Sequence, residues 1–421
     1  EISKELHVTK RQTEALIEIS DRLEVESLRI SNAGDRTITN PKLSVNGVEG
    51  WHDIKQILAQ VLDGHVKPQD RAKAIFQFVV ENRQHDEPPV EDDEPHDPVK
   101  FFNVYGYGFC DDAATNFGKL AIAAGMPAKI WSLGGQHVIA EIFYDNSWHL
   151  FDPDGEVYYA DPSSGNIVGL AEIRKHPDLL KLANSPIMRR SKLERIYTNR
   201  KHFDASNFYL RSTTPPHRMN YKLRPGESFC RYGNAKGWYF TNFYGDEPKN
   251  YSNGVWRFSP RFDLGPRRSG CSSFSDVRVD SMRGALLSVI NREGSLIYKF
   301  KSPWPYITAK MQLSGNGTFK IDISEDGKIW NQAGSMQGEI DVPVLLDNHF
   351  PNGFGSPLYA YWLRIRFEGR LDALTVESIV QTAPKSFPKF KAGDNETHYS
   401  QESPIDGSVV LTLELAESNR D

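Results

Sequence analysis

The chain has 421 residues, of which 39% are hydrophobic and 25% are charged, and its formal net charge at pH 7 is −5. This length exceeds what one hydrophobic core ordinarily holds and predicts two or three domains. No stretch approaches the roughly eighteen consecutive apolar residues of a membrane-spanning helix. The negative net charge argues against general affinity for nucleic acid.

The start of the chain and its cysteines bear on cellular compartment. The first residue is not Met and no apolar signal core follows it, so we expect a processed or trimmed chain. A secreted or periplasmic location is compatible with this, and the sequence assigns none. The three cysteines, Cys110, Cys230 and Cys271, are too few and odd in number for a disulfide framework. Their positions do not decide whether Cys230 and Cys271 pair.

Residues 1–50 are expected to form an N-terminal β element. A helix is predicted around residues 11–19. Residues 23–30 and 37–45 then alternate apolar and polar side chains, which is typical of half-buried strands. The turn between these two strands is expected at residues 32–35.

Residues 51–205 are expected to form the catalytic domain. Apolar residues recur at helical spacing in residues 54–61, 72–79 and 113–124, and Gly64 and Gly125 are expected to end the first and the third helix. Strands are predicted at residues 128–133, 137–144 and 147–151, with a tight turn at Asp145-Asn146. Helices followed by an antiparallel sheet predict an α+β core.

Residues 206–421 are expected to be rich in β-structure. Between residues 273 and 382, strands and turns alternate about every ten residues, which predicts a β-sandwich. Large aromatic side chains in this region either fill the sandwich core or stack against sugar rings. They are Trp304, Tyr306, Trp330, Tyr359, Tyr361 and Trp362.

Three residues of the catalytic domain suggest nucleophilic chemistry. Cys110 follows a glycine-rich loop and begins a helix, His137 begins a strand, and Asp152 ends the next strand. This order supplies a nucleophile, a base and an orienting carboxylate. A helix N-terminus and a nearby histidine both stabilise the thiolate, which is the attacking form of cysteine. The alternative is that Cys110 and His137 are ordinary buried residues.

Two acidic residues, Asp111 and Asp112, directly follow the cysteine. Pointing inward, they would disfavour a thiolate, whereas on the first helical turn they can face outward and complement the helix dipole. We expect the outward arrangement. The chemistry needs no cofactor. No metal site is predicted, because His96, His137 and His149 fit no regular ligand spacing.

Several neighbours of these residues are expected to contact substrate. The tyrosines Tyr105 and Tyr107 flank the cysteine loop and could donate hydrogen bonds or support a sugar ring. A further candidate, Gln136, could donate to an oxyanion together with the Cys110 backbone N–H. His149 and Tyr158 complete the predicted set, Tyr158 as a residue that closes the pocket.

Residues 68–160 resemble the transglutaminase-like superfamily, which is papain-related in its use of Cys, His and Asp. The resemblance rests on five motifs: Gly108-Phe109-Cys110, Gly125-Met126-Pro127-Ala128, Gly135-Gln136-His137, Trp148 and Asp152-Pro153. It implies that Cys110 is the nucleophile, His137 the general base and acid, and Asp152 the residue that orients His137. The sequence departs from the family pattern at Ile139, where an aromatic residue is usual, and at Asp111 and Asp112.

Three functions follow from these observations. The first is amide hydrolysis or acyl transfer by a cysteine enzyme, on a peptide or a glycan-associated substrate. The second is a polysaccharide lyase that uses His137 or a tyrosine on an acidic glycan, with basic residues between 189 and 201 neutralising the uronate. The third is a non-catalytic binding module. The sequence leaves the substrate and the oligomeric state open.

Overall fold

The computed structural model describes residues 2–8, 11–48, 50–86, 88, 94–134, 137–182, 197–198, 201–211, 215–233, 252–346, 350, 357–403 and 408–417. These residues are mostly β and form two compact units. One unit is Trp51–Arg218, and the other combines strands that precede residue 50 with strands that follow residue 219. The division of the chain into three domains stays a prediction.

The helices of the Trp51–Arg218 unit begin at recognisable capping residues. Asp53 caps α1 (Ile54–Val61), because its side chain accepts a hydrogen bond from the Gln56 N–H. Pro68 is the first residue of α2 (Pro68–Glu81), where a missing N–H costs nothing. The other helices are α3 (Pro98–Lys100), a π-helical turn (Phe101–Tyr105), α4 (Cys110–Ala123), α5 (Leu170–Lys175), a 3-10 turn (Pro177–Leu182) and α7 (Ser206–Tyr209).

A five-stranded antiparallel sheet forms the centre of this unit. Its order is β11–β10–β9–β8–β12. The strand bounds are β8 (Ala128–Leu133), β9 (Val138–Tyr144), β10 (Ser147–Asp152), β11 (Val157–Tyr158) and β12 (His202–Asp204). Asp145 and Asn146 both have positive φ, at 46° and 60°, as a two-residue hairpin turn requires.

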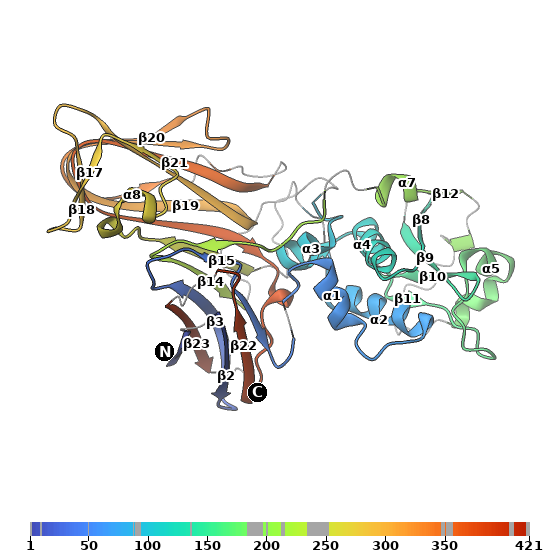
Figure 1. The fold of residues 1–421 in the computed structure, drawn as a ribbon. Coiled ribbons are helices and arrows are strands. Elements are labelled where there is room, and N and C mark those ends of the chain that lie inside the picture. Colours follow the sequence, from blue (N-terminus) through green and yellow to red (C-terminus); the bar gives the residue numbers. More distant parts are fainter. Residues whose placement is uncertain are drawn as a thin grey trace. The chain divides into compact units, whose positions relative to one another are not determined.

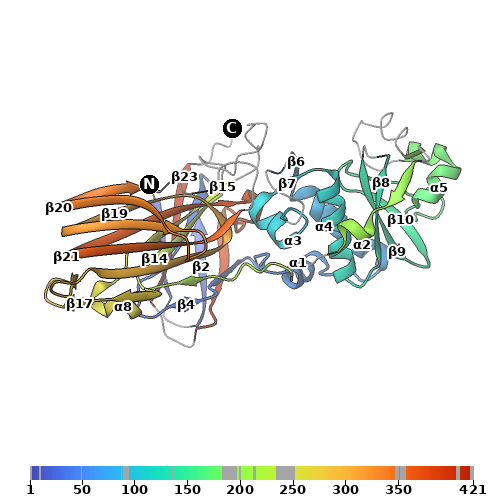
Figure 2. The same cartoon turned by 90° about the horizontal axis from the view of Figure 1, so that it is seen from above.

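The two faces of this sheet carry different layers. Phe151 packs against Phe76 of α2 and Phe117 of α4. The neighbouring residue Leu150 points to the opposite face and belongs to a second buried cluster that includes Ile173 of α5. Figures 1 and 2 show α4 and α5 on opposite sides of strands β8–β10. Because Asp152 follows Leu150 at a spacing of two, it shares the α5 face.

Strands from both ends of the sequence build the other unit. The segment predicted as a helix, residues 11–19, is instead strand β2 (Gln12–Ile19), whose side chains alternate in exposure. It pairs with β22 (Gly393–Ser400), and β22 pairs with β5 (Lys42–Val45). The helix prediction failed because the stabilising partner lies at the other end of the sequence, outside any local window.

A larger sheet brings in eleven strands of the described residues. Strand β23 pairs with both β1 and β3, and β14 pairs with both β3 and β15. The bounds are β1 (Ile2–Val8), β3 (Leu23–Asn32), β14 (Glu227–Tyr232), β15 (Ser252–Phe258), β16 (Ser273–Ser275), β17 (Val277–Asp280), β18 (Ala285–Ser288), β19 (Gly294–Ser324), β20 (Asn331–Leu345), β21 (Leu358–Thr382) and β23 (Val409–Glu417). Shorter pairs are β4 (Ile38–Thr39) with β13 (Lys222–Leu223) and β6 (Gln84–His85) with β7 (Tyr107–Gly108).

The larger sheet curls strongly along β19 and β21 (Figure 1). Tyr306 of β19 is paired with both Leu358 and Val380, so the two ends of β21 return to the same place. Within this pairing, Gly317 lies opposite Gly369, and both have positive φ, at 145° and 129°. A Cβ on Gly317 would lie 2.0 Å from the Glu368 carbonyl oxygen, so only glycine permits this close approach of the two backbones.

Five of the six aromatic residues singled out in the sequence of this unit fall into two groups. Trp304, Tyr306 and Tyr361 are buried and fill its interior. Trp330 and Trp362 are half-buried, and each has a cation over its ring: the Arg364 guanidinium at 4.3 Å from the Trp330 centroid, and the Lys299 ammonium at 4.5 Å from the Trp362 centroid.

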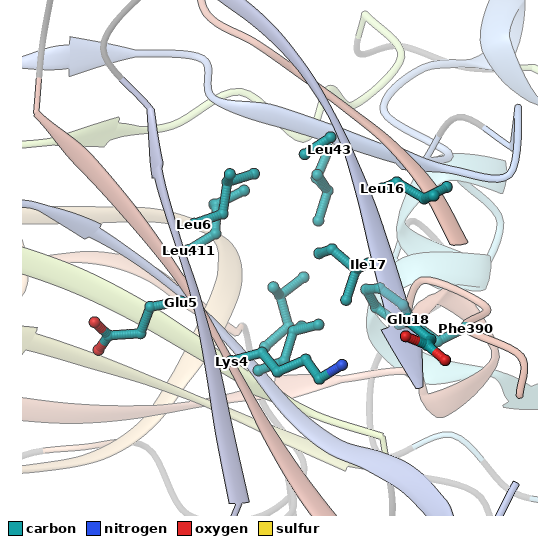
Figure 3. A pocket seen from close by; sticks show the side chains of 12 residues that line it. Lys4, Glu5, Leu6, Leu16, Ile17, Glu18, Leu43, Phe390 and Leu411 are labelled. Atoms are coloured by element: carbon teal, nitrogen blue, oxygen red, sulfur yellow. The ribbon is translucent and has the colours of Figure 1, made fainter. Parts of the chain in front are cut away.

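An apolar cavity of about 300 Å³ lies in this unit, among β1, β2, β3, β5 and β23. Figure 3 shows Leu6, Ile17, Leu43 and Leu411 directed into the same space, whereas the Glu5 carboxylate points away from it. The three cysteines are free thiols, so Cys230 and Cys271 do not pair. Across the described ranges, no helix combines the length and the apolar character needed to cross a membrane.

Candidate functional site

Cys110 is the first residue of α4 and is half-buried. Gly106, with φ of 72°, ends the preceding π-helical turn and lets the chain enter the short strand β7. At Gly108 a Cβ would lie 2.7 Å from both Asp112 Oδ2 and Phe101 Cε2, so a larger residue would displace the start of the helix. The glycine-rich loop therefore holds the cysteine at the helix N-terminus, where the helix dipole favours a thiolate.

The two acidic residues after the cysteine have partners of their own. Asp112 Oδ2 accepts a hydrogen bond from the Phe109 backbone N–H at 2.7 Å, which caps the helix. Its Oδ1 lies 3.1 Å from Nε2 of the buried His96, a separation suited to an ion pair although the ring is not aligned for a hydrogen bond. Asp111 Oδ2 is 3.9 Å from the same nitrogen. Asp112 is thus engaged by the helix backbone and by His96.

His137 and Asp152 form a buried pair. His137 Nε2 lies 2.7 Å from Asp152 Oδ2. The fully buried Asp152 also accepts hydrogen bonds from the Gly155 N–H, at 2.7 Å to Oδ1, and from the Tyr197 hydroxyl to Oδ2. A Cβ on Gly155 would lie 2.7 Å from Asp152 Oδ2, so glycine is required there for this approach. The carboxylate is held in one orientation, and it holds the imidazole in turn.

The environment of His137 favours its charged form. Burial disfavours the imidazolium, but the charge and hydrogen bond of Asp152 and the contact with Cys110 outweigh burial and raise the pKa of His137 from 6.5 to about 11. Burial also raises the pKa of Tyr197 well above 10, with the Asp152 charge adding to the effect. Tyr197 therefore stays protonated and donates to Asp152.

Cys110 is close to His137 and to a second carboxylate, Asp154. The Cys110 sulfur, a ring nitrogen of His137 and a carboxylate oxygen of Asp154 all lie within 4.8 Å of one another. Because His137 Nε2 is engaged with Asp152, Nδ1 is the ring nitrogen left for the sulfur. The structure thus brings Cys110, His137 and Asp152 together, with Asp154 beside them.

Asp154 is held by two basic residues that follow α2. Arg83 Nη2 lies 3.0 Å and His85 Nδ1 2.6 Å from Asp154 Oδ1. Burial acts to raise the pKa of Asp154, but the His85 hydrogen bond and the charges of Arg83 and His85 lower it below 3.8. Arg83 also donates to the carbonyls of Gly108 and Pro153. It therefore joins the segment before Cys110 to the segment after Asp152.

The predicted substrate contacts lie in several places. Tyr105 and Tyr107 are fully buried, and the Tyr105 hydroxyl donates to Glu94 Oε2 at 2.9 Å, so neither ring offers an open face to a sugar. Tyr158 packs its ring against Phe76 and Phe151 on the helix side of the sheet. Gln136 lies outside the described residues, as do most of the basic residues between 189 and 201.

His149 lies on the face of β10 opposite to Asp152. Its ring stacks on Tyr144 with centroids 3.7 Å apart, and Nε2 lies 2.9 Å from Ser147 Oγ. It lines a separate polar cavity of about 370 Å³ together with Asp161 and Glu172. The structure therefore does not bring His149 together with His137, nor does it combine His96, His137 and His149 in one cluster of described residues.

Sequence reasoning missed four residues of this site: Arg83, His85, Asp154 and Tyr197. Asp154 is the one that the sequence could most easily have suggested, since it follows Asp152 by two positions in the Asp-Pro-Asp turn. Arg83 and His85 are placed by the pairing of two very short strands, β6 and β7, in which His85 lies opposite Gly108. Tyr197 is 45 residues from Asp152 and stands in a stretch without periodicity.

Comparison with known families bears out the resemblance seen in the sequence. Residues 55–153 match the family model described as the transglutaminase-like superfamily. This stretch contains Cys110, His137 and Asp152. No curated protein matches the chain.

Solved structures of carbohydrate-binding modules show a weak similarity. A carbohydrate binding module of family 29 is 13% identical, over 32% of this chain and 84% of that chain, with a TM-score of 0.15. A mutant of such a module is 11% identical, over 35% of this chain and 92% of that chain, with the same TM-score. At this TM-score, we base neither a fold nor a ligand on the similarity.

Proposed function

We propose that this chain is a cysteine enzyme that transfers the acyl group of an amide to water or to an amine. Cys110 is the nucleophile, His137 the general acid and base, and Asp152 the residue that orients His137. The observation that carries the proposal is the position of His137, which is hydrogen-bonded to a fully buried carboxylate through Nε2 and lies within 4.8 Å of a thiol.

In the first half of the reaction, the Cys110 thiolate attacks the amide carbonyl carbon. A carbon–sulfur bond forms, and the carbonyl π electrons move onto oxygen. When the carbonyl re-forms, the carbon–nitrogen bond breaks and His137 gives its proton to the departing amine. The pKa of about 11 supports this assignment, because His137 then holds a proton at neutral pH and can act first as an acid.

In the second half, the thioester is released. The neutral His137 takes a proton from water or from an incoming amine as that group attacks the thioester carbonyl, and the carbon–sulfur bond breaks to return the thiolate. Acylation removes the negative charge of the sulfur, which is one cause of the raised pKa of His137. The ring is therefore less strongly protonated in the acyl-enzyme, as its role as a base requires.

Charge on the carbonyl oxygen needs hydrogen-bond donors. We propose that the first donor is the Cys110 backbone N–H, because the N–H groups of the first turn of α4 have no acceptor within the helix. The Gln136 side chain stays the second proposed donor. The tight packing at Gly108 and the hydrogen bond from the Phe109 N–H to Asp112 hold the start of α4. The Cys110 N–H should therefore keep its orientation during the reaction.

We also propose a fold type for each of the two units. We propose that α2, α4 and the five-stranded sheet are the α+β transglutaminase-like core, and that the curled strands β19–β21 belong to a β-sandwich. Support for the core comes from the helices and strands that pack around Phe76, Phe117 and Phe151. The curl of the paired strands β19 and β21 supports a sandwich, because Tyr306 pairs with residues near both ends of β21, so that these strands can contribute to two layers.

Amide chemistry is favoured over the polysaccharide lyase. The lyase would use His137 or a tyrosine as the base next to the cleaved bond, and His137 is engaged with Asp152 and lies beside the Cys110 thiol. Tyr105 and Tyr107 are fully buried, and Tyr197 is occupied by Asp152. A binding module without catalysis would not need the Asp152–His137 pair at a thiol.

The test compares wild type with Cys110→Ala on a panel of peptide amides and acidic polysaccharides. We expect a covalent acyl adduct on Cys110 of the wild type by intact mass and peptide mapping, and a loss of amide turnover of about 10³-fold or more in the variant. Cys271→Ser is the matched control, because serine can keep the hydrogen bonds to Ser273 O and Ile297 O. Cleavage of a polysaccharide at the wild-type rate by Cys110→Ala would overturn the proposal in favour of the lyase.

A further inference from the structure

We propose that Cys110, His137 and Asp154 together bind one zinc ion, which blocks the nucleophile. The binding site stands on geometry alone, and only its inhibitory consequence rests on the proposed function. The starting observation is that three potential ligand atoms of different residues converge within 4.8 Å of one another. Tetrahedral zinc bonds of about 2.0–2.3 Å place neighbouring ligand atoms about 3.3–3.8 Å apart, so small side-chain rotations complete the site.

The kinds of donor atom favour zinc over other common cations. A thiolate, an imidazole and a carboxylate form a mixed S, N, O set, which suits a borderline metal and not the oxygen-seeking Ca²⁺ or Mg²⁺. The two anionic ligands, Cys110 and Asp154, balance the charge of Zn²⁺, and His137 binds as the neutral imidazole after its Nδ1 proton is released to solvent. Three protein ligands leave the fourth tetrahedral position for water, as in open zinc sites.

The outer contacts of these three residues are those of a metal site. A metal-binding histidine usually donates its second ring N–H to a carboxylate, and His137 Nε2 has Asp152 at 2.7 Å. Asp152 is itself fastened by Gly155 and Tyr197. Arg83 and His85 both contact Oδ1 of Asp154, and Oδ2 receives no hydrogen bond from the described residues, which leaves it for a cation.

Asp154 is what distinguishes this site from a simple cysteine–histidine pair. The acyl-transfer chemistry assigns no role to a second carboxylate beside the thiol. Although Arg83 and His85 contact Oδ1 of Asp154, this carboxylate and the thiolate are two anionic ligands between which a divalent cation can bind. When zinc is bound, both the thiolate lone pair and His137 Nδ1 are occupied, so neither attack nor proton transfer can take place.

The experiment is a titration of the full chain with zinc chloride by calorimetry, in competition with a chromophoric chelator. We expect one zinc per chain, no detectable binding in Cys110→Ala, and at least tenfold weaker binding in Asp154→Asn. Cys271→Ser and Asp204→Asn are the matched controls and should bind zinc as the wild type does. Circular dichroism checks that each variant is folded.

Cobalt(II) provides a test that needs no variant. Bound at this site, it should give a thiolate-to-cobalt charge-transfer absorption and the intense visible bands of a tetrahedral ion. Absence of the charge-transfer absorption, zinc binding that survives in Cys110→Ala, or an unchanged affinity in Asp154→Asn would each overturn the proposal. Acylation of Cys110 in a chain that binds no zinc would overturn the zinc site alone. Zinc binding without acylation would support the metal site and count against the enzyme.

Discussion

Arg83 and Asp154 form an ion pair in the interior of the Trp51–Arg218 unit, with Arg83 Nη2 3.0 Å from Asp154 Oδ1 and both side chains less than a tenth exposed. The same guanidinium donates to the carbonyl of Gly108, which precedes Cys110, and to the carbonyl of Pro153, which follows Asp152. Because one rigid group contacts both segments, Arg83 sets the distance between the cysteine loop and the Asp152–Asp154 turn.

Replacing Arg83 by Met should destabilise this unit. The substitution leaves Asp154 as a buried charge without its principal cation, so the free energy of unfolding should fall by about 3–5 kcal/mol. Urea denaturation followed by tryptophan fluorescence measures this change. Arg261→Met is the control, because the Arg261–Asp263 pair is exposed and such pairs contribute about 0–1 kcal/mol. Equal effects of the two variants would contradict the structural role given to Arg83.

The charge of His137 should depend on Asp152. In Asp152→Asn the negative charge and the charge-assisted hydrogen bond are lost, so the pKa of His137 should fall from about 11 towards or below 6.5. Nitrogen-15 NMR of the imidazole across a pH titration measures this directly. Amide turnover should fall on the order of 10³- to 10⁴-fold, because the ring loses its orientation.

The same pair contributes to stability in a pH-dependent way. His137 binds its proton more tightly in the folded chain than in the unfolded chain, where its pKa is near 6.5. Its contribution is therefore complete below pH 6.5 and declines as the pH rises through about 11. Asp152→Asn should remove this decline, whereas Asp204→Asn, at an exposed carboxylate of the same unit, should keep it. If the free energy of unfolding of the wild type did not fall between pH 6.5 and about 11, the ion pair of His137 with Asp152 would be contradicted.

Tyr197→Phe tests the hydroxyl that donates to Asp152. A hydrogen bond to a buried charged group contributes about 1.5–3 kcal/mol, so the free energy of unfolding should fall by that amount. Tyr158→Phe is the matched control, since Tyr158 contacts its neighbours through its ring and should lose little on removal of the hydroxyl. If Tyr158→Phe alone raised KM for the substrate, the predicted substrate contact of Tyr158 would be supported.

The sequence was informative where the signal is local. The helical period placed a helix start at Cys110, and the alternation of residues 128–151 placed the strands that present His137 and Asp152. Each of these patterns lies within a window shorter than thirty residues. Arg83 could not be found in this way, because its role depends on the pairing of β6 with β7, two strands too short to show any period.

Non-local pairing also explains why residues 12–19 form a strand where the sequence predicts a helix. Residues 12–19 hold apolar side chains at positions 15, 16, 17 and 19, which fit either period over so short a stretch. What decides for a strand is the ladder with β22, in which Gln12 lies opposite Ser400 and Ile19 opposite Gly393. The alternating exposure of the β2 side chains is therefore set by pairing with β22, not by an intrinsic preference of these residues for the strand conformation.

This pairing across the whole sequence has a consequence for synthesis on the ribosome. Strands β1, β2 and β3 emerge before residues 51–218, yet β22 and β23, which hydrogen-bond to them, are translated after residues 51–218. Residues 51–218 are therefore complete while β1, β2 and β3 still lack these partner strands, and this part of its unit can begin to fold cotranslationally. A nascent chain halted after residue 218 should therefore contain a folded unit around the thiol and an N-terminal segment that chaperones recognise.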